Sequence, residues 1–177
     1  MKEMLRYGFT LTVICIVASG LLAGVNVLTK SRIAAQAQAE EDASLNEVLP
    51  EAAHFETVKS GEEIIYYKAH DKEKRLLGAA FRASGRGYSS TIETMVGMLK
   101  DGTIKAIKIL SQNETPGLGA RVTEDSFTSR FSNRGWQNLS EVDAITGATI
   151  SSRAVIDSVK KKAEEIKALL ENVPKDE

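Results

Sequence analysis

The feature that most constrains this chain is an uncharged apolar run near its N-terminus. Residues 9–28 read FTLTVICIVASGLLAGVNVL and contain no charged side chain. A helix rises about 1.5 Å per residue, so a run of this length crosses the roughly 30 Å hydrocarbon core of a membrane. We therefore predict a transmembrane anchor over residues 9–29, preceded by a short N-terminal segment at residues 1–8.

A cleaved signal peptide is the alternative interpretation of the same run. The apolar core of such a peptide is usually shorter, about 7–15 residues, and a small-residue cleavage site follows it. Here the run is longer and is followed by Thr29, Lys30, Ser31 and Arg32, which favours an uncleaved anchor. Basic residues flank the run on both sides, so the positive-inside rule does not set its orientation.

The overall composition is that of an ordinary globular domain with an appendage. The 177 residues are 42% hydrophobic and 27% charged, with a formal net charge of -1. This balance gives no electrostatic basis for binding nucleic acid, and we expect none. Cys15 is the single cysteine, and the two histidines fit no ligand spacing. We therefore expect no metal site, and a redox cofactor here would be organic or supplied by a partner.

Two patterns follow the apolar run. Residues 30–50 are rich in Ala, Gln and Glu and end at Pro50, which predicts a stalk helix. Beyond it, β-type runs predict four antiparallel strands arranged largely as hairpins, at residues 62–69, 76–83, 91–99 and 103–110. In the last of these runs, alternation places Ile104 with Ala106 on one face and Ile107 with Ile109 on the other.

Helical periodicity returns towards the C-terminus. Residues 123–131 start with Thr123 as a candidate cap and place Phe127 and Phe131 at helical spacing. A last helix is predicted over residues 151–170, with an apolar stripe formed by Val155, Val159, Ala163, Ile166 and Leu170. Residues 51–172 are therefore predicted to form an α+β domain, an antiparallel sheet with packed helices, followed by a tail at residues 173–177.

A hydroxyl-rich turn leads into that last helix. Residues 143–152 read DAITGATISS, in which the hydroxyl side chains are Thr146, Thr149, Ser151 and Ser152. Unpaired N–H groups and the positive end of the helix dipole favour a phosphate at this position. Any of the hydroxyls could bind that phosphate or serve as an attachment point, whereas an ordinary helix cap explains the same residues without a ligand.

A glycine-containing loop follows the last predicted strand. Residues 111–121 read SQNETPGLGAR, with a tight backbone path set by Pro116, Gly117 and Gly119. Two glycines let a backbone approach a flat ring system closely, although a plain turn between a strand and a helix explains them too. The glycine-rich stretch at residues 83–88, which ends in Tyr88, is likewise either a plain β-turn or part of a site.

The string D-x-x-T-G-A-T at residues 143–149 resembles the flavinylation motif of FMN-binding domains. In that family a flavin transferase links the phosphate of FMN to the last threonine through a phosphoester bond. The resemblance implies that Thr149 carries FMN covalently and that Asp143 serves recognition by the transferase. It also implies that the turn itself is shaped by Thr146, Gly147 and Ala148. Ser151 is a further cofactor-binding candidate because its hydroxyl could bind the phosphate.

The string E-T-P-G-L-G resembles the flavin-contacting loop of the same family. The residues that the resemblance places along the flavin ring are Glu114, Thr115, Gly117, Leu118 and Gly119. No general acid or base stands out, which suits an electron relay without bond-making chemistry on a substrate. We therefore assign no catalytic residue.

The order of these parts resembles the G subunit of Rnf complexes, membrane assemblies that couple electron flow between ferredoxin and NAD to ion transport. A related C subunit in the sodium-pumping NADH:quinone reductase is longer in its soluble part. The resemblance implies an electron-relay subunit of an ion-translocating oxidoreductase, with the other membrane subunits as its partners. It also implies a cytoplasmic N-terminus and an extracytoplasmic FMN domain. Two alternatives remain, a standalone membrane-anchored flavin reductase and a non-redox binding or assembly module.

Overall fold

The computed structural model describes residues 2–61 and 63–171, so the predicted tail at residues 173–177 lies outside the described residues. The chain divides into two compact units, Met1–Asp42 and Ala43–Glu177. The elements in chain order are α1 (Lys2–Val48), β1 (His54–Ser60), β2 (Glu63–His70), β3 (Leu76–Arg86), β4 (Thr91–Leu99), β5 (Thr103–Ser111), η1 (Gly119–Thr123), α2 (Asp125–Thr128), η2 (Ser129–Phe131), β6 (Arg134–Gly135), η3 (Trp136–Glu141) and α3 (Thr149–Glu171).

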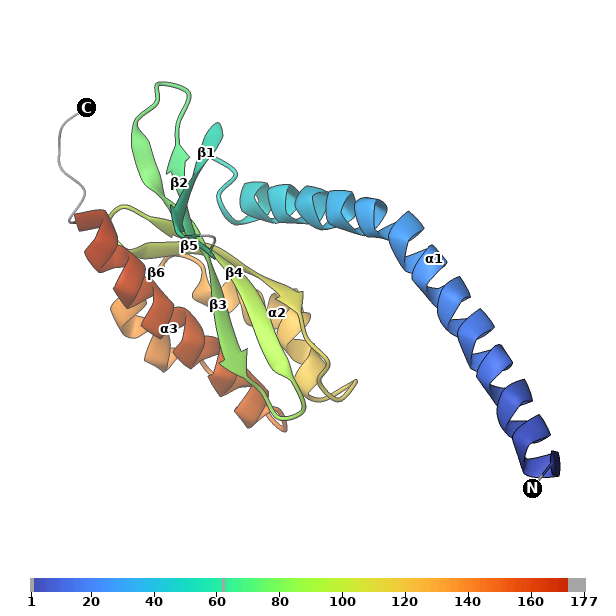
Figure 1. Ribbon diagram of the computed structural model, residues 1–177. Helices are drawn as coiled ribbons and strands as arrows, with labels where there is room; N and C mark the ends of the chain where they lie inside the picture. The colour runs from blue at the N-terminus through green and yellow to red at the C-terminus, as the bar shows by residue number, and fades with distance from the viewer. Residues whose placement is uncertain (1, 62, 172–177) are drawn as a thin grey trace. The chain divides into compact units, whose positions relative to one another are not determined.

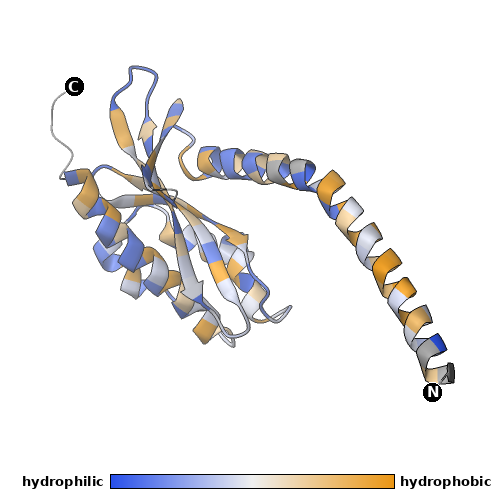
Figure 2. Ribbon diagram, viewed as in Figure 1, coloured by the Kyte–Doolittle hydropathy of each residue, from blue (hydrophilic) through white to orange (hydrophobic). Residues whose placement is uncertain are grey.

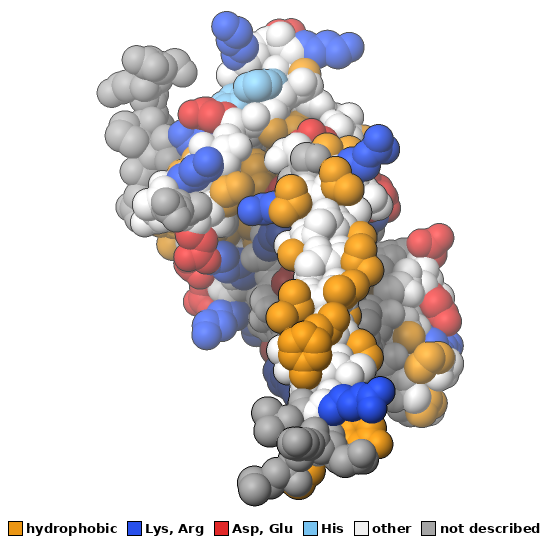
Figure 3. Space-filling model, turned by 45° about the vertical axis from the view of Figure 1, so that its right-hand side comes forward, with side chains coloured by type: hydrophobic (Ala, Val, Ile, Leu, Met, Phe, Trp, Pro, Cys, Tyr) orange, Lys and Arg blue, Asp and Glu red, His pale blue; other side chains and the backbone are white. Residues whose placement is uncertain are grey.

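The first part of α1 has the length and composition of a membrane span. Residues Arg6–Lys30 form a 25-residue apolar stretch, none of which is buried against the rest of the protein. Figure 2 shows this apolar stretch giving way to a more hydrophilic second part of α1, and Figure 3 shows apolar side chains gathered on its surface. A folded protein in water rarely leaves so long an apolar surface uncovered. The stretch is therefore suited to a lipid environment.

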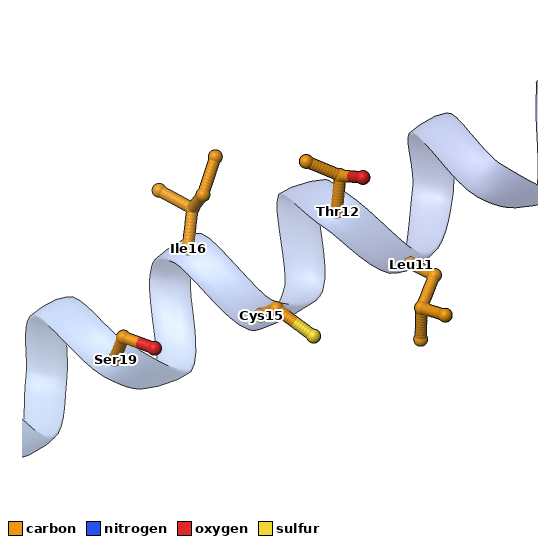
Figure 4. A pocket seen from close by; sticks show the side chains of 5 residues that line it. All are labelled: Leu11, Thr12, Cys15, Ile16 and Ser19. Atoms are coloured by element: carbon orange, nitrogen blue, oxygen red, sulfur yellow. The ribbon is translucent and has the colours of Figure 1, made fainter.

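Threonine hydroxyls within this stretch are satisfied by the helix itself. Thr12 and Thr29 each donate a 2.9 Å hydrogen bond to the carbonyl four residues earlier. Such internal bonds suit a helix that has no water to supply partners. A shallow hollow on this surface is lined by Leu11, Thr12, Cys15, Ile16 and Ser19 (Figure 4). All five belong to one helix, so the hollow is a gap between neighbouring side chains of α1.

The second unit is built on a six-stranded antiparallel sheet in the order β1-β2-β3-β4-β5-β6 (Figure 1). Each strand pairs with the next one in sequence, and short turns connect β1 to β5 as successive hairpins, whereas η1, α2 and η2 lie between β5 and β6. Between β4 and β5, Gly102 adopts a φ of 92°, and the Asp101 carboxylate accepts a 2.8 Å hydrogen bond from the Thr103 amide. The four strands predicted from the sequence correspond to β2–β5.

Two edge strands were not predicted. The β1 strand has no fully buried residue, so its sequence HFETVKS lacks the apolar alternation that marks a half-buried strand. The β6 strand has two residues, Arg134 and Gly135, and is too short to carry a pattern. The predicted class, α+β with an antiparallel sheet and packed helices, is confirmed.

Apolar side chains cover both faces of the sheet. On one face α3 packs through the predicted stripe, and all five stripe residues are buried in a cluster with the sheet. On the other face the end of α1 packs through Leu45, Val48 and Leu49 against a second cluster. Gly97 permits this contact, since a Cβ at this position would lie 2.3 Å from the Val48 carbonyl oxygen.

The predicted assignment of faces in β5 was wrong for Ile104. Ile104 belongs to the same buried cluster as Ile107 and Ile109, whereas Ala106 packs with the cluster on the other face. The pairing shifts register here, with Gly97 opposite Ala106 but Met98 opposite Ile104. This β-bulge inserts one extra residue, which reverses the alternation of side chains beyond it.

The predicted helix at residues 123–131 is shorter than expected. It consists of a four-residue α2 between two 3-10 turns, η1 and η2. The Thr123 hydroxyl donates to the Ala120 carbonyl at 2.9 Å and does not cap α2. Phe127 and Phe131 are nevertheless fully buried and meet edge to face with their ring centroids 5.4 Å apart. Packing of these two rings, rather than a regular helix, therefore holds the segment on the sheet.

Candidate functional site

A cavity of about 430 Å³ lies at the N-terminal end of α3. It is formed by the turn between β3 and β4, by the loop after β5, and by the residues that begin α3. The lining residues are Tyr88, Glu114, Thr115, Leu118, Gly119, Gly147, Ala148, Thr149, Ile150 and Ser151. The fold thus brings together the two strings that stand apart in the sequence, E-T-P-G-L-G and D-x-x-T-G-A-T.

The carboxylate of Glu114 connects the three parts of the cavity wall. Its side chain is buried, at 5% exposure. Oε1 accepts hydrogen bonds from the Ser89 and Ser90 amides at 3.0 and 2.9 Å and from Ser90 Oγ at 3.2 Å. Oε2 accepts from the Tyr88 amide at 3.1 Å and from Ser151 Oγ at 2.6 Å. One side chain of the β5 loop therefore holds both the β3–β4 turn and the start of α3.

These hydrogen bonds keep Glu114 ionised. Burial by itself would raise the pKa of the Glu114 carboxyl, but hydrogen bonds from the Ser151 hydroxyl and from the amides of residues 88–90 outweigh it. The pKa falls from an ordinary value of 4.5 to about 2. The site therefore contains a negative charge at neutral pH.

Two glycines make room for this carboxylate. A Cβ at Gly87 would lie 2.6 Å from Glu114 Oε1. A Cβ at Gly119 would lie 2.8 Å from Glu114 Oε2 and 2.6 Å from Ser151 Oγ. These distances are far inside van der Waals contact, so any other residue at either position would displace the hydrogen-bonded groups.

The T-G-A-T turn is held in place by backbone conformation and by hydrogen bonds to buried groups. Gly147 adopts a φ of 82°, which an L side chain rarely accepts. The Ile145 amide donates to Ser152 Oγ at 3.0 Å, and the Ala148 amide donates to the Ile145 carbonyl at 2.9 Å. The α3 helix begins at Thr149, and the Ser152 amide donates to the Ala148 carbonyl at 2.9 Å. The amides of residues 149–151 precede this bond and therefore have no acceptor within the helix.

The four hydroxyls of this segment have different environments. Ser151 and Ser152 are buried at 2% and 0% exposure, and both are used in the hydrogen bonds described above. Thr146 and Thr149 are exposed. Of these two, Thr149 lines the cavity and Thr146 does not. Among the four, only Thr149 is both exposed and part of the cavity wall, and within the described residues its hydroxyl makes no hydrogen bond.

Three of the predicted site residues lie outside the cavity wall. Gly117 adopts a φ of 73° in the β5 loop, where it sets the backbone path without lining the cavity. Asp143 is exposed, and its carbonyl oxygen accepts a 2.7 Å hydrogen bond from Arg130 Nη1. Thr146, in the turn that leads into α3, is also outside the wall. The remaining predicted residues all line the cavity.

The cavity wall also contains two apolar residues that were not assigned to the site, Tyr88 and Ile150. Tyr88, Leu118 and Ile150 are 71%, 51% and 56% exposed, and they come from three different segments. The sequence signal for Ile150 was a large apolar residue beside Thr149 and off the buried stripe of α3. These side chains give the cavity an apolar surface open to solvent, which suits one face of a flat aromatic ligand.

Two family models match separate parts of the chain. The FMN-binding domain matches residues 87–164, a range that contains the whole cavity wall. The RnfG N-terminal region matches residues 1–48, which include the apolar helix. The fold and the cavity therefore define an FMN-binding domain that follows, in the sequence, an N-terminal helix of membrane-spanning length.

Relatives in three organisms match nearly the whole chain. The G subunit of the ion-translocating oxidoreductase complex of Methanosarcina acetivorans is 32% identical over 172 residues, covering 89% of this chain and 92% of the relative. The G subunit of the proton-translocating ferredoxin:NAD(+) oxidoreductase complex of Clostridium ljungdahlii is 31% identical, with 88% of each chain covered. The Na(+)-translocating counterpart of Acetobacterium woodii is 32% identical, with 89% of each covered. This chain belongs to the family of G subunits of ion-translocating oxidoreductase complexes.

The fold is shared with a solved structure. The C subunit of the Na(+)-translocating NADH-quinone reductase from Parabacteroides distasonis is similar with a TM-score of 0.51 and 20% sequence identity. The match covers 62% of this chain and 63% of that one. The predicted resemblance to G subunits of such complexes is confirmed by the relatives, and the likeness to the C subunit is one of fold.

Proposed function

We propose that this chain is the electron-relay subunit of a membrane-bound, ion-translocating ferredoxin:NAD oxidoreductase complex and carries FMN in phosphoester linkage on Thr149. The observation that carries the proposal is the position of Thr149. Of the four hydroxyl residues it is the one that is both exposed and part of the cavity wall, and it begins a 23-residue helix. The names of the relatives, which belong to ferredoxin:NAD(+) oxidoreductase complexes, support the assignment to such a complex.

The start of α3 provides the binding site for the phosphate. The amides of residues 149–151 have no acceptor within the helix, and the helix dipole adds a partial positive charge at the same place. A phosphate linked to Thr149 Oγ1 would accept hydrogen bonds from these amides. Gly147 and Ala148 keep the turn small, and Thr146 beside them is exposed to solvent. A transferase would therefore be able to reach Thr149.

Attachment requires the Thr149 hydroxyl to act as the nucleophile. Thr149 Oγ1 would form the new bond to phosphorus and lose its proton to the transferase. A flavin dinucleotide donor balances this transfer, because its pyrophosphate P–O bond breaks and a nucleoside monophosphate leaves. Asp143, exposed at the head of the motif, would serve recognition by that transferase rather than electron transfer.

The remainder of the cavity would hold the flavin ring. FMN supplies one- and two-electron chemistry, and the protein determines its position and its electrostatic surroundings. Leu118 would contact the ring, and Gly119 would bring the backbone close to it. Thr115, which lines the same wall, would hydrogen-bond to a polar ring edge. Because the cavity is open on one side, the ring would keep an edge accessible to a redox partner.

The assembly would be completed by other membrane subunits. Residues 9–29, within the candidate span Arg6–Lys30, would cross the membrane, with residues 1–8 on the cytoplasmic side and the FMN domain on the extracytoplasmic side. A covalent bond would prevent loss of the cofactor from a shallow site on that side. The described residues contain one candidate span, so ion translocation would belong to the polytopic subunits.

The test is to produce the full chain with an active flavin transferase and to look for flavin fluorescence on the denatured protein band. Thr149→Val should abolish the fluorescence, whereas Thr146→Val, which removes the other exposed hydroxyl of the motif, should retain it. A dark wild-type band, with the transferase active on another substrate protein, would refute the covalent flavoprotein. If Thr146→Val lost the fluorescence and Thr149→Val retained it, the attachment site would be Thr146 instead of Thr149.

A further inference from the structure

Glu114 is the only carboxylate among the residues that line the cavity. Its hydrogen-bond partners in the described part of the chain are three backbone amides and the hydroxyls of Ser90 and Ser151, all of them neutral. No Lys or Arg of residues 2–61 and 63–171 forms an ion pair with it. Neutral donors stabilise a carboxylate without cancelling its charge, so the cavity wall carries a negative charge that no Lys or Arg of the described residues neutralises.

The position of this charge follows from Ser151. Its hydroxyl lies 2.6 Å from Glu114 Oε2, and Ser151 is two residues beyond Thr149 in the first turn of the same helix. The charge therefore lies within about one helical turn of the attachment threonine. Solvent screens a buried charge much less than a surface one, so the charge acts strongly over such a distance.

We propose that Glu114 is a positioning residue that joins the three walls of the cavity and, through its fixed negative charge, lowers the reduction potential of the flavin held there. The proposal rests on the function proposed above. Reduction adds electrons to the ring system, and a neighbouring negative charge raises the energy of the reduced form relative to the oxidised form. A carboxylate held by neutral donors lowers the potential more than one neutralised by an arginine.

The hydrogen bonds of Glu114 also fix the shape of the cavity. They hold the amides of Tyr88, Ser89 and Ser90 in one turn, and Tyr88 is the exposed aromatic residue of the cavity wall. Gly87 and Gly119 lack the Cβ atoms that would displace the carboxylate. The same side chain therefore positions the aromatic wall and supplies the charge.

The charge is tested by the flavin midpoint potential. The full chain, flavinylated and purified in detergent, is titrated at pH 7 as wild type, Glu114→Gln and Glu164→Gln, with flavin absorbance as the signal. Glu164 is an exposed glutamate of α3, so its variant makes the same change in net charge away from the cavity. We expect a more positive midpoint in Glu114→Gln and an unchanged midpoint in Glu164→Gln. A folded, flavinylated Glu114→Gln protein with the wild-type midpoint overturns the proposal.

A second variant keeps the test decisive if Glu114→Gln does not fold. Ser151→Ala removes one neutral donor and leaves the charge in place, so its midpoint should lie at or below that of the wild type. A positive shift in Ser151→Ala contradicts an electrostatic role for the carboxylate. A wild-type protein that takes up no flavin is a different result, since it refutes the proposed function before any potential is measured.

The positioning role is tested without flavin. Amide hydrogen exchange is measured in Thr149→Val, which cannot carry the cofactor, with and without the additional change Glu114→Gln. We expect slow exchange of the amides of residues 88–90 when Glu114 is present and faster exchange when it is replaced, with the α3 core unchanged. Equal exchange at these amides in the two proteins, or rapid exchange with Glu114 present, overturns the positioning role.

Discussion

The Ser151 hydroxyl donates a 2.6 Å hydrogen bond to Oε2 of Glu114, a residue 37 positions earlier in the chain. This bond joins the first turn of α3 to the loop that follows β5. Both groups are buried, so removing the Glu114 carboxylate would leave the Ser151 hydroxyl without its acceptor, at a cost of about 1–3 kcal/mol. The site is therefore held by a contact between its two sequence motifs.

The space around this pair predicts a strict requirement for glycine. Gly119→Ala should lower the free energy of unfolding by about 1–3 kcal/mol, because the new Cβ overlaps Ser151 Oγ. It should also reduce flavin incorporation. Gly135→Ala is the matched control, since no atom lies within 4 Å of its Cβ and its φ is -64°. That change should leave stability unaltered or raise it by up to about 1 kcal/mol. Urea unfolding followed through Trp136 fluorescence measures both, and equal losses would contradict the expectation.

The ionisation of Glu114 predicts a specific acid sensitivity. The folded pKa of this carboxyl, about 2, lies below the ordinary value of 4.5. Its contribution to stability is therefore complete above the ordinary value and is lost as the pH falls towards 2. Between pH 5 and pH 2 the wild type should lose on the order of 2 kcal/mol more stability than Glu114→Gln. If the stability of the wild type and of Glu114→Gln fell equally with pH, the pKa of Glu114 would not be lowered in the folded protein.

Regular elements of this fold were predictable where one local pattern dominated. The α3 stripe repeats at helical spacing along the helix, and all its members are buried as expected. Asp101-Gly102 has the chemistry of a tight turn, and it connects β4 to β5. The β5 bulge was not predictable, because a single extra residue changes the pairing without changing the composition of the strand.

The candidate site was predictable in its motifs but not in the roles of individual groups. Thr149 could be named from the sequence, yet four hydroxyls were chemically equivalent there until burial separated Ser151 and Ser152 from the exposed threonines. The contacts of Glu114 reach residues 24–37 positions away. Such contacts depend on the complete fold, and no local pattern encodes them.

The α3 interface predicts a large cost for deleting one buried side chain. Ile156 is fully buried between α3 and the sheet, so Ile156→Ala should lower the free energy of unfolding by about 2–5 kcal/mol. Leu169 lies on the same helix at 38% exposure, and Leu169→Ala should cost less than about 1 kcal/mol. Urea unfolding of the two variants gives the comparison. Similar values would mean that α3 does not pack as described.

The boundary between the two compact units predicts where the chain can be shortened. A chain that begins at Ala43 retains Leu45, Val48 and Leu49, which cover the second face of the sheet. It should fold, remain in solution without detergent and still accept flavin, because it lacks the apolar stretch and keeps the whole cavity.

A chain that begins at Ala53 is the matched comparison. It loses three buried side chains worth about 1.5–3 kcal/mol each and exposes Tyr67 and Met95 on the sheet. It should therefore melt at a clearly lower temperature and aggregate on gel filtration, although its cavity residues are identical. Thermal melts that coincide for the two chains would show that the end of α1 contributes nothing to the domain. A chain from Ala43 that stays insoluble would place the requirement for detergent in the FMN domain rather than in the apolar stretch.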